Sequence, residues 1–328
     1  MNNQLANIAL IAGGYSGEAE VSVRSAAVIM QNIDNSKFNA YLISITRERW
    51  VCLFDGYEFP VDKNDFTVEL NGKKIIFDTA FIMIHGTPGE DGLLQGYFDM
   101  LQIPYTTCNA VVSSVTFNKY FCNKVVSTFG GAKVAASEVI TRHLAYNINE
   151  IAQNVGFPCF VKPNAGGSSI GTTKVHTFDK LHEAIDIAFA EDDEVMIERF
   201  ISGKEITCGV LRSRGQLISL PLTEVRSKKE FFDFEAKYDP ELADEITPAP
   251  IDESLTKQIQ LLSEKYYDLL NCKGVVRFDY IVEGNDIWFL EVNTIPGMSA
   301  ESIVPQQAEA YGWSYTELTT RIIEESLK

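Results

Sequence analysis

The sequence predicts a protein of mixed α+β and α/β class, built in three parts along its 328 residues. Three observations support this prediction. Short apolar runs alternate with amphipathic segments in the first third, a pattern typical of a parallel sheet covered by helices. A glycine-rich loop follows a strand in the middle third, and predicted strands dominate the last third. We therefore expect three domains, at residues 1–107, 108–203 and 204–328.

The first part opens with an apolar strand that runs into two glycines. Strands are predicted over Asn7–Ala12, Phe38–Ile45 and Thr79–Ile84. Amphipathic periodicity over Val21–Ile33 and Gly92–Leu101 indicates two helices. Because strands and helices alternate along the chain, we expect a Rossmann-like parallel sheet in this domain.

The middle part continues the alternation of helix and strand around the glycine-rich loop. Its predicted helices are Asn118–Phe129, Asn147–Val155 and Phe178–Ala190. Its predicted strands are Lys133–Ile140, Pro158–Lys162, Thr172–His176 and Val195–Arg199.

The last part is predicted to be mainly strand, with one long connector. Its strands are predicted over Glu205–Leu211 and Gln216–Leu220 and in a hairpin over residues 274–293, and its helices over Ser254–Leu270 and Tyr315–Leu327. The connector Pro221–Asp252 lacks periodicity, so we expect an irregular loop that is mobile when the site is empty.

The composition excludes several classes of protein. Lys and Arg number 28 against 45 Asp and Glu, which gives a formal net charge of −17. Such a surface repels phosphate groups, so we expect neither nucleic acid nor a membrane as partner. The N-terminus lacks the positive start of a signal peptide, and no segment approaches the ~20 apolar residues of a membrane-spanning helix. The six cysteines are scattered without a CxxC pair, which indicates reduced thiols in a cytoplasmic protein.

A polar pair ends an apolar strand in the segment FLEVNTIPGMS. Strand side chains alternate between faces, so Glu291 and Asn293 share a face, as Arg277 and Asp279 do on the preceding strand. An odd turn, such as one of three residues, would place Asp279 opposite Glu291, whereas an even turn would put them on opposite faces. Opposed carboxylates repel each other unless a cation lies between them, and an oxygen-only set suits Mg²⁺ or Mn²⁺. The alternative is a solvent-exposed polar end of an amphipathic hairpin.

The stretch FVKPNAGGSSIG is an apolar strand that ends at Lys162-Pro163 and leads into a loop of glycines and serines. Glycines let backbone N–H groups crowd around a phosphate, and serine hydroxyls add donors. The loop matches neither the P-loop pattern nor the strict dinucleotide pattern, and a plain turn is the alternative. Glu198 and Glu205 lie at the ends of two successive strands. The phenylalanines of FFDFEAKY indicate a loop that folds over a site and carries Lys237 into it.

Six motifs, taken in order, resemble the ATP-grasp superfamily and, within it, the D-alanine–D-alanine ligase family. They are AGGYSGEAEVS, HGTPGEDG, VKPNAGGSSIG, EAKY, RFD and LEVNTIPGMSAESIVP, and they cover nearly the whole chain. The resemblance implies an ATP-grasp fold in which the central and C-terminal β-rich lobes clamp the nucleotide. It also implies ATP-dependent ligation of two D-alanine molecules through a D-alanyl phosphate, which gives D-alanyl-D-alanine for peptidoglycan.

The resemblance implies roles for the charged residues. Asp279, Glu291 and Asn293 match the ligands of two Mg²⁺ or Mn²⁺ ions that bridge the ATP phosphates. Phosphoryl transfer needs such positioning and charge neutralisation more than covalent help. The residues that match ATP contacts are Lys119 and Lys162 for the α- and β-phosphates, Lys237 for the γ-phosphate, and Glu198 and Glu205 for adenine and ribose.

The first amino-acid site is implied in the same way. Glu18 matches the carboxylate that pairs with the ammonium of the first D-alanine, and a helix N-terminal cap is its alternative role. Ser168 and Tyr238 match its hydrogen-bonded partners. His85 and Asp91 lie in the loop that borders this site, with a supporting role.

The second site and the reaction centre complete the resemblance. Arg277 and the backbone N–H of Gly297 match the pair that stabilises the tetrahedral oxyanion. Ser302 matches the hydroxyl at the carboxylate of the second D-alanine. Relatives that form D-alanyl-D-lactate lack the tyrosine at position 238, so Tyr238 favours the dipeptide product. Family members are commonly homodimers.

The chain departs from the family pattern at Ala19, Phe232 and Phe234 and in the loop tip Asn164-Ala165-Gly166. These departures bear on loop kinetics and nucleotide affinity. Three alternatives stand beside the ligase: a related ligase that uses D-lactate or another acid, a nucleotide-binding module without catalysis, and a nicotinamide-dependent dehydrogenase. The retained Arg277 disfavours the second, and the absence of a hydride-acceptor constellation disfavours the third.

Overall fold

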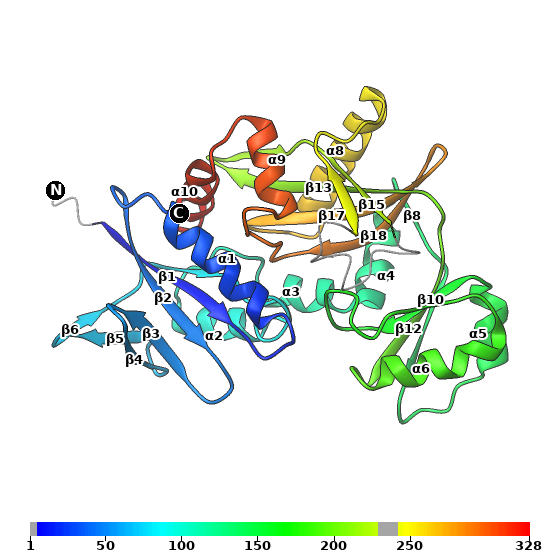
Figure 1. Cartoon of the computed structure of the whole chain (residues 1–328), viewed down its shortest axis with the longest axis horizontal. Helices are drawn as coiled ribbons and strands as arrows, with labels where there is room; N and C mark the ends of the chain where they lie inside the picture. The colour runs from blue at the N-terminus through cyan, green and yellow to red at the C-terminus, as the bar shows by residue number, and fades with distance from the viewer. Residues whose placement is uncertain (1–4, 229–241) are drawn as a thin grey trace.

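The computed structural model describes residues 5–228 and 242–328. Three β-sheets, two of seven strands and one of four, follow one another along the chain. The N-terminal sheet lies at one end of the molecule, the four-stranded sheet at the other, and the C-terminal sheet extends between them (Figure 1). The predicted mixture of helix and strand in three parts is confirmed.

The N-terminal sheet combines a parallel core with an antiparallel extension. Its strand order is β6-β5-β4-β3-β2-β1-β7. The parallel strands are β1 (Ala6–Gly13), β2 (Phe38–Ile45) and β7 (Thr79–Ile82). The antiparallel extension consists of β3 (Trp50–Phe54), β4 (Tyr57–Asp62), β5 (Thr67–Leu70) and β6 (Lys73–Ile75). The extension was not predicted, because its strands are only three to six residues long and β3 alone among them, with the sequence WVCLF, is a continuous apolar run.

Helices cover this sheet as the sequence predicts. They are α1 (Ala19–Asn32) and α2 (Leu93–Leu101), and the C-terminal helix α10 (Tyr315–Ser326) joins them. Leu318 and Ile322 of α10 are buried in the same hydrophobic core as Ile8 and Leu10 of β1. The end of the chain therefore packs against its beginning, and α10 lies beside α1 in Figure 1.

The central sheet is antiparallel throughout, in the order β11-β10-β12-β9. Its strands are β9 (Ser137–Thr141), β10 (Cys159–Pro163), β11 (Thr173–Val175) and β12 (Glu194–Arg199). One face packs against α5 (Ile148–Val155) and α6 (Leu181–Phe189), which follows the short 3₁₀ helix η1 (Phe178–Lys180). The opposite face of the sheet is not covered by these helices and is turned to the rest of the molecule.

The C-terminal sheet has the order β16-β15-β13-β17-β18-β8, with β14 paired to β13. Its strands are β8 (Lys133–Val134), β13 (Lys204–Ser213), β14 (Gln216–Ser219), β15 (Thr223–Ser227), β16 (Ala243–Ile246), β17 (Val275–Glu283) and β18 (Asp286–Asn293). Its helices are α3 (Ala110–Phe117), α4 (Lys119–Phe129), α8 (Glu253–Leu269) and α9 (Ile303–Tyr311). Side chains of α3, α4 and α8 share one hydrophobic core with β17 and β18.

Two predicted elements need correction. The strand predicted over Lys133–Ile140 is two strands, because β8 joins the C-terminal sheet and β9 the central sheet, with Ala135-Ala136 between them. The connector Pro221–Asp252 is not irregular throughout, since β15 and β16 pair with each other in its described parts. Periodicity missed both features, because each of these strands is only two to five residues long.

The hairpin of β17 and β18 has the predicted register, but its turn differs from the predicted one. Glu283 pairs with Asp286, so the turn has two residues instead of three. A β-bulge then shifts the register between Asp279 and Tyr280, and Leu290 is the extra residue. The even turn therefore does not separate the carboxylates, and Asp279 pairs with Glu291.

The bulge also changes which side chains of β18 share a face, because strict alternation would place Phe289 on the face of Glu291. Ile287, Phe289 and Val292 all belong to the hydrophobic core, together with Tyr280 of β17. Phe289 therefore does not share a face with Glu291, as a regular strand would require. The bulge turns the strand so that its last residues expose a polar face opposite the core.

Candidate active site

The end of the hairpin gathers four polar side chains. Arg277 pairs with Asn293, and Asp279 with Glu291. Arg277 Nε and Nη2 each donate to one oxygen of Asp279 at 2.8 Å, and Asn293 Nδ2 donates to Asp279 Oδ2 at 2.8 Å. Asp279 is only 2% exposed, so its charge is balanced by Arg277 and not by water. The structure brings these four residues together in the predicted pairs.

Arg277 is held in a strongly acidic environment. Burial alone would lower its pKa, but Asp279, Glu291 and Glu245 together raise that pKa above its ordinary value. Gln306 of α9 donates to Glu245 at 3.1 Å. Arg277 is therefore a permanent positive charge at the polar end of the hairpin.

The polar end of the hairpin has the donor chemistry of a magnesium or manganese site. Asp279, Glu291 and Asn293 offer oxygen atoms, the donors that both ions prefer. Asn293 turns its nitrogen toward Asp279, so its carbonyl oxygen faces away from that residue. A cation would relieve the repulsion between the two paired carboxylates. Across residues 5–228 and 242–328, no group of three or more His, Cys, Asp or Glu side chains could hold a metal, and the predicted set contains only two carboxylates.

The free face of the central sheet carries Lys162 and Glu198. Lys162 Nζ donates to Glu198 Oε2 at 2.7 Å, and Asn123 of α4 donates to Glu198 Oε1 at 3.0 Å. Lys162 is 9% exposed and Glu198 3%. This face is therefore linked through α4 to the C-terminal lobe.

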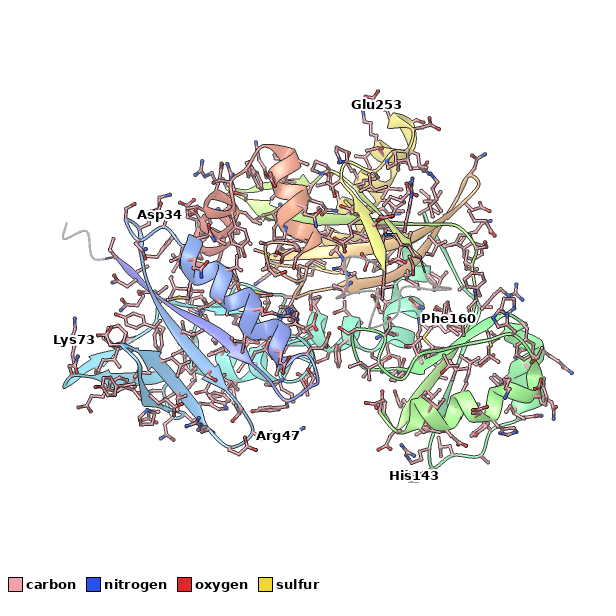
Figure 2. All side chains as sticks on the ribbon, viewed as in Figure 1. Asp34, Arg47, Lys73, His143, Phe160 and Glu253 are labelled. Carbon is pink, nitrogen blue, oxygen red and sulfur yellow. The ribbon has the colours of Figure 1, made fainter. Side chains whose placement is uncertain are left out.

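An aromatic pair borders the same face. Phe160 pairs with Glu198 across β10 and β12, and its ring lies 5.8 Å from the ring of Phe200. Lys174 Nζ lies 3.8 Å from the centre of the Phe200 ring. In Figure 2 the labelled Phe160 stands on the side of the central lobe that faces the C-terminal lobe. The two rings are not among the predicted site residues, although alternation along β10 puts Phe160 and Lys162 on one face.

Lys119 ties the glycine-rich loop to α4. Its Nζ donates to the carbonyl oxygen of Gly166, and its backbone N–H donates to Asn164 O at 3.0 Å. Asn164 accepts from Tyr120 N at 2.9 Å and donates to Glu194 at 2.7 Å. The unusual residue Asn164 thus holds the base of the loop against the start of α4.

Lys119 and Glu291 both lie near Cys122 of α4. Burial and, to a smaller extent, the charge of Glu291 raise the pKa of the Cys122 thiol to about 12, and the charge of Lys119 opposes them. Both charges therefore act on one buried side chain. The loop that holds Lys119 and the hairpin that holds Glu291 meet at this helix.

Glu18 and Ser168 meet across the boundary between the N-terminal and central domains. Ser168 Oγ donates to Glu18 Oε1. Glu18 is at the N-cap position of α1, but its side chain makes no capping hydrogen bond. A Cβ atom on Gly167 would lie 2.6 Å from Glu18 Oε2, so the glycine allows this close approach. Glu18 therefore points to the glycine-rich loop and not to its own helix.

His85 lies buried near Glu18. Burial lowers the pKa of His85, and the charge of Glu18 partly opposes this effect. Within the part of the chain that the structure describes, its Nε2 atom has no hydrogen-bond partner. Buried polar atoms in folded proteins nearly always find a partner, so this nitrogen is available to a bound water or a bound molecule.

The loop over residues 294–299 is fixed by contacts from the N-terminal domain. Ile295 N donates to Glu90 Oε1 at 3.3 Å, and Met298 N donates to Ser25 Oγ at 3.3 Å. Ser302 Oγ accepts from Ser299 N at 3.0 Å, and a Cβ atom on Gly297 would lie 2.8 Å from the same hydroxyl. Gly297 and Ser302 are thus close neighbours, and Gly297 leaves its backbone accessible.

Glu90 is a site residue that sequence analysis missed. It accepts Gly86 N at 2.8 Å as well as Ile295 N, and therefore joins the HGTPGEDG loop to the Gly297 loop. Burial and the charge of Glu18 raise its pKa to about 8. Glu90 is part of the HGTPGEDG motif, but the sequence does not show that Ile295 lies within hydrogen-bond distance of it.

The other predicted site residues have fewer contacts that define their place in the site. Glu205 lies on β13 two residues before Thr207, which pairs with Asp279, so Glu205 shares the face of Asp279. Asp91 accepts from Leu93 N at 3.1 Å, which fits its supporting role at the start of α2. Lys237 and Tyr238 lie outside the described residues.

The chain is similar to known proteins over most of its length. Residues 7–108 match the family model described as "D-ala D-ala ligase N-terminus", and residues 131–324 the model described as "D-ala D-ala ligase C-terminus". A D-alanine–D-alanine ligase of Bacteroides fragilis is 47% identical over 320 residues, which is 97% of this chain and 98% of the relative.

Two solved structures have the same fold. The VanG D-Ala:D-Ser ligase from Enterococcus faecalis is 33% identical with a TM-score of 0.86, over 98% of this chain and 100% of that one. The D-alanyl-alanine synthetase A from Vibrio cholerae is 27% identical with a TM-score of 0.88, over 98% of both chains.

Proposed function

The chain belongs to the D-alanine–D-alanine ligase family, and from this membership we infer how its residues carry out the reaction. It ligates two D-alanine molecules with ATP through a D-alanyl phosphate, giving D-alanyl-D-alanine, ADP and phosphate for peptidoglycan synthesis. The fold is the ATP-grasp fold of its structural neighbours. We propose domain boundaries at 107/108 and 203/204.

One observation supports the residue roles above all others: the register that pairs Arg277 with Asn293 and Asp279 with Glu291. It collects a fixed cation and three oxygen-bearing side chains at one end of one hairpin. We propose that Asp279, Glu291 and Asn293 hold two Mg²⁺ or Mn²⁺ ions. When bound, these ions would neutralise charge on the ATP phosphates.

We propose that the nucleotide lies between the central and C-terminal sheets. Lys119 and Lys162 would hold its α- and β-phosphates, and Glu198 and Glu205 its adenine and ribose. The rings of Phe160 and Phe200, which lie 5.8 Å apart beside Glu198, support an apolar wall for the base. Lys237, outside the described residues, would reach the γ-phosphate.

The first D-alanine would lie between Glu18, His85 and Ser168. Glu18 would pair with its ammonium group. Nε2 of His85 has no hydrogen-bond partner among the described residues, which supports a substrate contact there. We propose that Tyr238, outside the described residues, completes this group.

The second D-alanine would bind next to the loop over residues 294–299. Ser302 would hold its carboxylate. As its amine attacks the acyl phosphate, Arg277 and the N–H of Gly297 would stabilise the oxyanion.

The test is phosphate release from Mg·ATP in the presence of single amino acids. We expect release with D-alanine and none with L-alanine. Equal turnover with both enantiomers, or none with either, would contradict the proposal. Mass spectrometry of products from mixed D-alanine and D-lactate is expected to show the dipeptide, and a predominant D-alanyl-D-lactate product would identify the alternative ligase.

We also propose a cytoplasmic homodimer. No described helix is both long and apolar enough to span a membrane. All six cysteines are free and buried, which suits a reducing compartment. Exposed apolar side chains on three successive helices support an interface between copies: Leu93 (65% exposed), Met100 (80%), Val111 (71%) and Phe121 (56%).

A further inference from the structure

A side-chain amide fills a gap in the C-terminal sheet. One edge of β13 pairs with β15 over Glu205–Thr207 and with β14 over Val210–Ser213, which leaves Cys208 and Gly209 between them. Gln307 of α9 enters this gap. Gly209 N donates to its Oε1 at 3.0 Å, and its Nε2 donates to Thr207 O at 3.1 Å. The amide therefore takes the place of a peptide group from a neighbouring strand.

The environment of Gln307 is complete and buried. Its side chain is 0% exposed, and Nε2 also donates to Thr223 Oγ1 at 3.1 Å. A Cβ atom on Gly209 would lie 2.6 Å from Gln307 Oε1, so the glycine makes room for the amide. An apolar side chain of the same size would leave Gly209 N–H buried without a partner, which costs free energy.

The amide connects the two halves of the reaction centre. Thr207 pairs with Asp279 across β13 and β17. Gln307 lies five residues after Ser302, the N-cap residue of α9, and Ser302 in turn contacts the loop that contains Gly297. Gln307 thus contacts β13, the strand next to the hairpin of β17 and β18 that holds the proposed metal ligands. Through α9 it is also joined to the proposed site of the second D-alanine.

We propose that Gln307 is a positioning residue for the second substrate. It fixes α9 against β13, and thereby fixes Ser302 and Gly297 relative to Asp279 and Arg277. This inference rests on the proposed function, because it concerns the site of the attacking D-alanine.

The test compares Gln307→Leu with a matched control in the same lobe. Ser263→Ala removes a buried hydrogen bond to Tyr280, on the core side of the hairpin away from α9. In assays that resolve the two D-alanine sites, we expect Gln307→Leu to raise KM at the second site at least 10-fold and leave KM for ATP within 2-fold. Ser263→Ala is expected to change neither.

A second readout does not depend on catalysis. We expect hydrogen exchange at residues 297–303 to become faster in Gln307→Leu and to stay unchanged in Ser263→Ala. If Gln307→Leu does not fold, Thr223→Val removes one partner of the amide and should raise the same KM about 3-fold.

The outcomes separate the two proposals. Equal increases of all KM values, or kinetics and exchange like those of the control, would overturn the role of Gln307. A wild-type protein that makes no dipeptide would overturn the proposed function instead, whatever the exchange data show.

Discussion

At the residue scale, Glu291 tests the proposed metal site most directly. It pairs with Asp279 across β17 and β18, where the oxygen atoms of the proposed ligand set lie together. Glu291→Gln removes one charge from the proposed ligand set. We expect kcat to fall at least ~100-fold, because metal ions contribute several kcal/mol of charge stabilisation. Phosphate release with Mg·ATP and D-alanine measures this loss.

The matched control is Glu283→Gln at the turn end of the same hairpin. Glu283 is exposed and pairs with Asp286 far from Arg277. We expect wild-type activity in this variant and a folded protein in Glu291→Gln. Normal turnover in Glu291→Gln would remove Glu291 from the metal site.

Glu90 predicts a pH dependence of stability. Its pKa is raised to about 8 in the folded protein from an ordinary value of 4.5. Between these values the folded state holds one proton more than the unfolded state, so the contribution of Glu90 to stability falls as pH rises. We expect the free energy of unfolding of Glu90→Gln, relative to wild type, to rise between pH 5 and 8 by at most ~1.4 kcal/mol per pH unit.

Denaturant titrations at several pH values measure this difference. Above pH 8 the two proteins should change in parallel, because Glu90 is then ionised in both states. A difference that stays constant from pH 5 to 8 would show that the Glu90 carboxyl is ionised like an exposed one.

At the scale of elements, the glycine-rich loop depends on the contacts of Asn164 with α4. Asn164→Ala would leave Tyr120 N–H without its acceptor and remove the shorter of two hydrogen bonds to Glu194, which would keep only the one from Asn118 Nδ2 at 3.3 Å. We expect KM for ATP to rise about 10-fold, since the loop and Lys119 lose their common anchor. The free energy of unfolding should fall by ~1–3 kcal/mol, the usual cost of a buried group left unpaired.

Asn147→Ala is the control for this prediction. Asn147 caps α5 by accepting from Asn149 N and Glu150 N, on the side of the central sheet away from Lys162. Its loss should cost ~1 kcal/mol of stability with no change in KM for ATP. An equal change of KM in both variants would indicate a general weakening of the central domain.

The hairpin shows what sequence could and could not predict at this scale. Alternation gave the right partners for Asp279 and Arg277, because a pairing register depends only on counting residues between strands. The predicted pairing was right for the wrong reason. The turn has two residues instead of three, and Leu290, as the extra residue of the bulge, restores the register. A bulge depends on how the whole sheet twists, and no local pattern in the segment predicts it.

At the scale of the whole molecule, residues from the regions of all three sheets form the candidate site. Glu18 comes from the N-terminal domain, Ser168 and Lys162 from the central one, and Asp279 and Gly297 from the C-terminal one. Motifs could predict these residues one by one. Glu90 and Gln307 escaped prediction because their partners lie about 100 to 200 positions away, as in the bond from Ile295 to Glu90.

The exposed face of α2, α3 and α4 leads to a prediction about assembly. Leu93 and Met100 lie seven residues apart on α2 and so share one face, and α3 packs directly beside it. We expect light scattering to give about twice the chain mass of 36.6 kDa. Met100→Glu with Val111→Glu should give the mass of one chain at micromolar concentration, because the interface would have to bury two unpaired charges from each chain.

The fold of each chain should survive this change, since Met100 is 80% exposed and Val111 71% in the isolated chain. Leu144→Glu, at a side chain that is 67% exposed in a turn of the central domain, is the control and should remain dimeric. The double variant should keep its ligase activity at high protein concentration, because every proposed site residue comes from one chain. An unchanged dimer mass in the double variant would exclude these helices as the interface.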